Sequence, residues 1–430
     1  MAATHPTPER APPVHQTTEP AAPDSATLPV ATLHRWRGAL FAAFFVTGLS
    51  MATWVTRTPD IRDVTGASTA QMGLIIAGLS VGSMVGISVG GALVARRGGR
   101  FVVRWGMTAI VAGVATVALA TAAHSGVLVA VGLALFGYGM GSGEIGQNVE
   151  GVALEQQMRR TVVPSLHGCY SLGIFVGGLT GLAANAVALP VTVHLLVAAA
   201  VTAAASVWLV VNLPAATGRE SARETGPSAE AVDRPGSVWR EPRTVAIAVV
   251  ILGMALAEGS ANDWLPLIMV DGFALTATVG ALIYAGFGGA MAVGRFAGGA
   301  LLDRFGRTRV LLTSAALAAT GIAAVAFAPN AALGGAGVVL WGLGASLGFP
   351  VALSAAGDDP VGSARRVSAV ATAGYAAFLV GPPVLGLLGE HWGLRGAIVV
   401  VLVMVGVAAV FIPRIRPLTP AAPSAPVSAA

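Results

Sequence analysis

The stretch Gly299-Ala-Leu-Leu-Asp303-Arg-Phe-Gly306-Arg307 separates two long apolar runs of the chain. A similar stretch, Gly91-Ala-Leu-Val-Ala95-Arg-Arg-Gly98-Gly-Arg100, begins 208 residues earlier and also separates two apolar runs. A second pair of glycine motifs, at positions 137–143 and 342–348, is 205 residues apart. Because the two offsets are nearly equal, the sequence predicts two parallel halves that repeat one arrangement of helices.

Apolar runs extend over most of the chain. Hydrophobic residues occupy 55% of the 430 positions and charged residues only 10%, whereas a soluble globular protein is about 25% charged. Twelve runs are long enough to cross a bilayer, which takes about 20 helical residues. They are 38–57, 72–95, 101–122, 126–150, 164–188, 191–213, 244–265, 275–302, 308–328, 331–356, 367–389 and 393–413. We therefore expect an all-α membrane protein with twelve transmembrane helices in two pseudo-symmetric six-helix bundles.

Hydrophilic segments divide the chain into five predicted parts. These are a disordered tail at 1–34, a six-helix bundle at 35–213, a linker at 214–242, a second six-helix bundle at 243–413 and a disordered tail at 414–430. All basic residues are arginines, and with the N-terminus inside, only Arg57, Arg62 and Arg395 fall on the outer side. This asymmetry predicts that both termini and the linker are cytoplasmic.

Several function classes are excluded by composition. The arginines between apolar runs explain the net charge of +5 through membrane orientation, so no nucleic-acid partner is expected. The single cysteine, Cys169, excludes an intramolecular disulfide and a cysteine-based zinc site. Without lysine there is no Walker A motif. We expect no metal, no cofactor and no enzymatic activity.

The stretch at 299–307 resembles the loop signature of the major facilitator superfamily, and the resemblance extends over residues 38–413. It implies that superfamily's fold, with the first, fourth, seventh and tenth helices around a central cavity. The first copy of the signature departs from the pattern, because Ala95 stands where an aspartate is expected. Further segments resemble a bacterial branch related to fucose-permease-type proteins: 54–59, 144–155, 164–173, 257–264 and 381–383.

Two polar stripes lie within the apolar runs. Glu258, Asn262 and Asp263 belong to the seventh run, with Glu258 near the membrane midplane and Asp263 about a turn nearer the outside. Glu144 and Asn148 share one face of the fourth run. Charges within a bilayer are costly, so we expect these residues to contact substrate or carry a proton, and Glu258 is the first candidate for the proton. The competing interpretation is that they only join neighbouring helices by hydrogen bonds.

A second group of residues is expected to control opening and closing. Asp303 resembles the gating aspartate of the superfamily signature, and Arg304 and Arg307 belong to the same stretch. Arg295 lies in the eighth run, before this stretch. We expect Arg295 to pair with Asp303, or with the ends of the eleventh helix, and so to stabilise one conformation.

Four aromatic residues complete the candidate set. Trp54 and Trp264 are predicted near the outer interface, where they belong either to an aromatic belt or to the cavity lining. Tyr284 and Tyr375 are further cavity candidates. His167, at the start of the fifth run, is expected to be a hydrogen-bonded packing residue rather than a proton relay.

These features predict a secondary active transporter in the bacterial inner membrane. The resemblance to fucose-permease-type proteins implies proton-coupled uptake of a small polar solute, such as a sugar, by a monomer. The expected partners are this small-molecule substrate, protons and the lipid bilayer. The alternative is a proton-antiport exporter of a drug or secondary metabolite. The fourth run has no arginine and the fifth has Gly173-x-x-x-Gly177-Gly178 without proline, and both absences weigh against the exporter.

Overall fold

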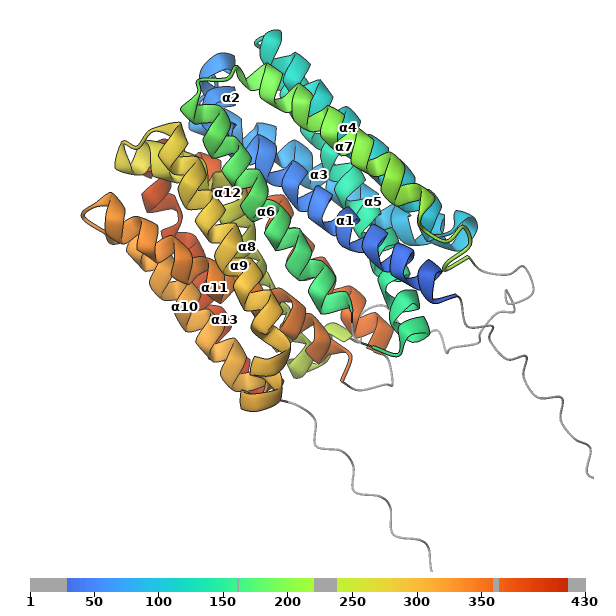
Figure 1. The fold of residues 1–430 in the computed structure, drawn as a ribbon. Coiled ribbons are helices and arrows are strands. Elements are labelled where there is room, and N and C mark those ends of the chain that lie inside the picture. Colours follow the sequence, from blue (N-terminus) through green and yellow to red (C-terminus); the bar gives the residue numbers. More distant parts are fainter. Residues whose placement is uncertain (1–28, 161, 220–237, 359–362, 417–430) are drawn as a thin grey trace, which may run out of the picture.

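The computed structural model describes residues 29–160, 162–219, 238–358 and 363–416 (Figure 1). These residues form α-helices and two short 3₁₀ helices, and they contain no β-strand. The N-terminal half contains α1 (Val30–Val55), the short α2 (Thr58–Thr65), α3 (Thr69–Arg97), α4 (Gly99–Ala122), α5 (Gly126–Met158), α6 (Val163–Ala186) and α7 (Val191–Val211). The C-terminal half contains η1 (Val238–Arg240), α8 (Pro242–Phe273), α9 (Ala277–Phe305), α10 (Arg307–Phe327), α11 (Ala331–Ala356), α12 (Ser363–Ala397), α13 (Val399–Phe411) and η2 (Ile412–Ile415).

The helices account for the twelve predicted runs. Eleven are long and apolar enough to cross a membrane. The twelfth is interrupted: the backbone of α12 breaks at Gly393, where φ is 71° and ψ is 155°, and the last residues of α12 continue into α13. The chain is therefore an all-α, multi-pass membrane protein.

Several predicted boundaries need correction. α1 begins at Val30, so the last residues of the predicted tail at 1–34 are helical. α5 continues to Met158, beyond the predicted end at position 150. Polar residues can extend a helix beyond the lipid without changing the length of the apolar run. η1 lies within the predicted linker, and η2 extends to Ile415 in the predicted C-terminal tail. Residues 1–28, 220–237 and 417–430 of the predicted tails and linker lie outside the described part of the chain.

The repeated stretch has the same backbone form in both halves. Gly98 and Gly306 stand between consecutive helices with φ of 85° and 74°, a region that favours glycine. Each glycine ends one long helix and precedes the next, which explains its place in both copies of the sequence.

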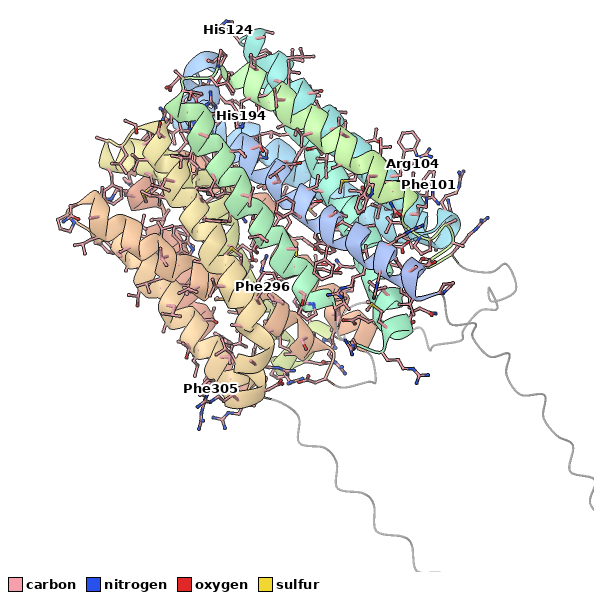
Figure 2. The ribbon with its side chains drawn as sticks, in the orientation of Figure 1. Phe101, Arg104, His124, His194, Phe296 and Phe305 are labelled. Carbon is pink, nitrogen blue, oxygen red and sulfur yellow. The ribbon has the colours of Figure 1, made fainter. Side chains whose placement is uncertain are left out.

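Helices within each half pack closely. In the N-terminal half, α5 lies between α3 and α4, and α1 packs against α6 and α7. In the C-terminal half, α11 contacts α9 and α10, while α8 contacts α12 and α13. The halves meet mainly through α6 with α9 and α3 with α12, and lie side by side in Figure 1. Phe296 of α9 fills part of this boundary (Figure 2), where a Cβ at Gly168 of α6 would come within 2.6 Å of its ring.

The two halves are joined at the end opposite the termini, which we call the far end. Arg62 of α2 pairs with Asp271 of α8. The backbone N–H of Ala70 donates to Glu390 Oε2 at 2.9 Å, and Asn185 Nδ2 donates to the Ala277 carbonyl at 3.2 Å. These contacts cross from one half to the other, so the far end is closed.

Candidate functional site

An ion pair lies in the middle of the helix bundle. Glu258 is at the centre of α8, at the depth that its position in the apolar run predicts. Arg295 Nη2 of α9 lies 2.7 Å from Glu258 Oε1, and each side chain is 10% exposed. The two charges offset part of the cost of burying either one.

The same guanidinium also reaches two further helices. Arg295 Nη1 donates to Ser171 Oγ of α6 at 2.8 Å, and Nε donates to the Ser346 carbonyl of α11 at 3.3 Å. Ser171 belongs to the N-terminal half, so Arg295 binds both halves at once. The prediction that Arg295 pairs with Asp303 or with the ends of the eleventh helix is wrong, because its ionic partner is Glu258. Asp303 lies about 12 Å further along α9 by helix rise, whereas Glu258 lies beside Arg295 at the same depth.

Glu144 faces this ion pair from the N-terminal half. Its carboxylate, on α5, is close enough to Glu258 and Arg295 for their charges to act on it. The hydroxyls of Tyr170 and Tyr375 lie within range of the Glu144 charge. Within the described ranges, Glu144 has neither a hydrogen bond nor an ion pair. The two polar stripes predicted from the sequence therefore meet at one centre.

Asn262 and Asp263 lie on α8 between this centre and the far end. Tyr284 of α9 is fully buried and its hydroxyl donates to Asn262 Oδ1 at 3.3 Å. Asp263 is 4% exposed, and no described residue donates a hydrogen bond to it or pairs with it. Both candidates are inside the protein, and Asp263 is a buried carboxyl group without a partner among the described residues.

Asn148 belongs to a hydrogen-bonded contact within the N-terminal half. Its Oδ1 lies 3.2 Å from His167 Nε2 of α6. The His167 ring packs edge-on against Phe44 of α1, with centroids 5.0 Å apart. This geometry agrees with the packing role expected for His167, and it places Asn148 at the α5–α6 contact.

The candidate tryptophans are interior residues. Trp54 is 1% exposed and Trp264 is fully buried, and neither indole N–H has a hydrogen-bond partner among the described residues. Trp54 packs edge-on against Phe136 of α5, with centroids 6.5 Å apart. The aromatic-belt interpretation is therefore wrong for both, because a belt residue faces lipid. The sequence could not have shown this burial, because helices that are apolar on every side have no period that separates lipid-facing positions from interior ones.

The sequence comparison identifies the family. The Major Facilitator Superfamily profile matches residues 2–149, 158–364 and 265–430. The chain belongs to the Major Facilitator Superfamily.

Relatives in this superfamily match over nearly the full length. An uncharacterized transporter of Sinorhizobium fredii, y4wD, is 28% identical over 89% of this chain and 98% of its own. A variant of the nucleoside transporter NupG has a similar structure, with a TM-score of 0.70 and 14% identity over 88% of this chain and 99% of its own. The Escherichia coli fucose:proton symporter FucP gives a TM-score of 0.62 and 16% identity over 88% and 98%. The chain is thus a membrane transporter of this superfamily and not an enzyme.

The superfamily signature in the C-terminal half forms an ion cluster at the end that carries the termini. Asp358, just after α11, accepts bonds from Arg307 at 2.5 and 2.8 Å and from Arg243 at 2.7 Å. Asp303 and Arg304 are exposed. Within the described chain Asp303 has no partner, and Arg304 lies over the Phe305 ring at 5.3 Å. Arg307 therefore fixes helices within one half in this conformation and does not bridge the two halves.

Asp358 was missed by the sequence reasoning, and the offset of 205 between the matching helices pairs it with Ala153. Another carboxyl group, Glu150 of α5, lies towards the same end of the bundle. Glu150 is fully buried beside Gly99 and Arg100, at the start of α4. Burial alone would raise the pKa of Asp358, and the hydrogen bonds from Arg307 and Arg243 outweigh it and hold that pKa below its ordinary value.

A separate cavity of about 570 Å³ lies at the far end, lined mainly by the N-terminal half and also by Ala277 and Thr278 of the C-terminal half. Its polar lining includes Arg57, Asp60, His124 and Asn185. Arg57 is 3% exposed and donates to Asn185 Oδ1 and to the Leu189 carbonyl. Burial raises the pKa of Asp60, against the opposing charge of Arg57. Because Asn185 also donates to Ala277 across the interface, this cavity borders the closed far-end contact.

Proposed function

We propose that the protein is a proton-coupled secondary transporter of a small polar solute, and that the Glu258–Arg295 pair links protonation to the conformational change. The observation that supports this proposal is the position of Arg295, which contacts Glu258 in its own half and Ser171 in the other half. Any change in the charge of Glu258 alters a contact on which the arrangement of both halves depends.

Protonation of Glu258 would change the partner of Arg295. A neutral Glu258 no longer attracts the guanidinium as an ion, and the other carboxylate that acts on this centre is Glu144 of α5. Attraction between Arg295 and Glu144 would then connect the C-terminal half to the N-terminal half by opposite charges. In this mechanism, protonation of Glu258 changes the ionic partner of Arg295 from a residue of the C-terminal half to a residue of the N-terminal half. The equilibrium between the two conformations of the transporter then shifts.

The polar character of the solute rests on the residues around this centre. Asn262, Tyr284, Tyr170 and Ser171 supply hydrogen-bonding groups at or near the interface of the halves. The names of two similar structures, a nucleoside transporter and a fucose:proton symporter, fit a polar solute and, in the second case, proton coupling. A sugar is the solute suggested by the sequence resemblance.

The proposed setting is the bacterial cytoplasmic membrane, with both termini in the cytoplasm and one chain as the working unit. The near absence of arginine from the far-end segments supports this orientation. The far end would then face outward, so the conformation described above is closed to the outside.

Transport in proteoliposomes tests the proposal. Vesicles with an imposed pH gradient would be supplied with radiolabelled sugars and nucleosides that raise the melting temperature of the purified protein. We expect uptake that depends on the gradient in the wild type and is lost in Glu258→Gln, while Arg309→Gln, which changes an exposed charge away from this centre, retains it. Uptake that ignores the pH gradient, or that persists at full proton-driven rate in Glu258→Gln, would overturn the proposal. Gradient-driven efflux instead of uptake would favour the exporter.

A further inference from the structure

The charges at the centre of the bundle do not balance. Three carboxyl groups, Glu144, Glu258 and Asp263, lie within the membrane-spanning parts of α5 and α8, and Arg295 pairs with Glu258. Glu144 and Asp263 are left without a hydrogen-bond or ionic partner in the described ranges. An unpaired charge within a membrane protein is costly and marks a functional group by default.

Glu144 and Asp263 differ in their surroundings. The Arg295 guanidinium acts on Glu144, which gives that carboxylate an internal counter-charge once Glu258 is neutral. Asp263 has no such counter-charge, because no described residue pairs with its buried carboxyl group. When Asp263 is ionised, the balancing positive charge comes from outside the chain.

The environment of Asp263 is suited to an organic cation. Its charge acts on the hydroxyls of Tyr170 from the N-terminal half and Tyr284 from the C-terminal half, so the carboxyl group lies near the boundary of the halves. The Glu150 oxygens and the Trp264 indole N–H are sealed from solvent without a partner, whereas neither Asp263 oxygen is sealed in this way. A ligand can therefore reach Asp263, and the tyrosine rings near it favour a cation.

We infer that the transported solute is a small polar amine whose positive charge binds Asp263. This inference rests on the proposed transport function and specifies the class of solute. One such cation together with one proton at the Glu144–Glu258–Arg295 centre would neutralise the two unbalanced carboxylates. The proton-coupled mechanism and the charge of the solute are then complementary.

Matched ligand pairs test this inference in the purified full-length protein. The probes are glucosamine with glucose, and choline with its neutral carbon analogue 3,3-dimethylbutan-1-ol. We expect at least one amine to raise the melting temperature in a saturable manner while its neutral partner does not. The shift should disappear in Asp263→Asn and remain in Asp263→Glu, which keeps the charge. Arg309→Gln, at an exposed site, should retain the wild-type shift.

The outcomes separate this inference from the proposed function. Equal shifts for amine and neutral partner, no shift with either amine, or an amine shift that survives Asp263→Asn would overturn the cationic class. Gradient-driven, Glu258-dependent uptake of a neutral sugar would do the same while leaving the proton-coupled transporter intact. Amine binding at Asp263 with transport that ignores the pH gradient would support the inference and overturn the proton coupling. If Asp263→Asn fails to fold, Asp263→Glu decides the question. The inference then requires that the amine raises the melting temperature of Asp263→Glu as it does that of the wild type, and that the neutral partner does not.

Discussion

Arg295 lies 2.7 Å from Glu258 in its own half and donates at 2.8 Å to Ser171 in the opposite half. One planar guanidinium thus combines charge neutralisation with a contact between the two moving parts of the molecule. A lysine could supply the charge, but its single ammonium cannot reproduce the fork that reaches both partners and the Ser346 carbonyl.

The first prediction concerns the stability of this pair. Arg295→Gln leaves Glu258 buried without its counter-charge, and we expect a loss on the order of 3–5 kcal/mol at neutral pH. The double variant Arg295→Gln/Glu258→Gln removes both charges and should recover much of that loss, as a positive coupling in a double-mutant cycle. Melting temperatures of the purified variants measure it. Additive losses in the double variant would show that the two charges do not stabilise each other.

The second prediction concerns the closed far end. A Cβ at Gly73 of α3 would lie 2.8 Å from the Pro382 carbonyl and 3.0 Å from Gly386 Cα, both of α12. Gly73→Val should overpack this contact at a cost of about 1–3 kcal/mol. Even the lower value lowers the ratio of closed to open molecules about fivefold. The far-end distance between the halves should lengthen.

Spin labels can measure that distance. In a Cys169→Ser background, cysteines at Val187 and Phe327 would carry the labels, since these side chains are 72% and 66% exposed at the far ends of opposite halves. Gly406→Val is the matched control, because a Cβ at Gly406 meets nothing within 4 Å. An unchanged distance distribution in Gly73→Val would mean that the α3–α12 contact does not hold the far end closed.

The sequence could predict the helices because lipid restricts the backbone so strongly. In lipid, each apolar run must pair its backbone N–H and C=O groups within itself, which only a helix allows here. The repeat at positions 91 and 299 indicated two halves. The end of α5 at Met158 could not be predicted in this way, because that part of the helix extends beyond the apolar run.

The candidate site was predicted only in part. The depth of Glu258 follows from counting residues along its run, and a cavity shared with Glu144 followed from the resemblance. The partner of Arg295 could not be predicted, since it depends on how α8 and α9 are rotated about their axes. Asp303 was the neighbour available in the sequence, while Glu258 is the neighbour in space.

The third prediction concerns pH and the ion cluster at Asp358. Hydrogen bonds from Arg307 and Arg243 lower the pKa of Asp358 in the folded state, so its contribution to stability is present above its unfolded pKa, about 3.9. That contribution is lost as pH falls through the lower folded value. Asp358→Asn should destabilise the protein by about 1.5–3 kcal/mol at pH 7, and the difference from wild type should shrink below about pH 4. Melting curves from pH 7 to pH 3 measure this; a difference that stays constant over the range would contradict the ionic origin.

The fourth prediction concerns Asp303, which is exposed and has no partner within the described chain in this conformation. Asp303→Asn should therefore change stability by less than about 0.5 kcal/mol. If Asp303 stabilises the alternative conformation, its loss favours the state that is closed at the far end, and turnover should fall while the KM for the transported solute stays near the wild-type value. Arg309→Gln changes another exposed charge nearby and should leave turnover unchanged. Initial rates over a range of solute concentrations separate the two parameters. A rise in KM without a loss of turnover would place Asp303 in solute binding, and the gating role drawn from the signature would then be wrong.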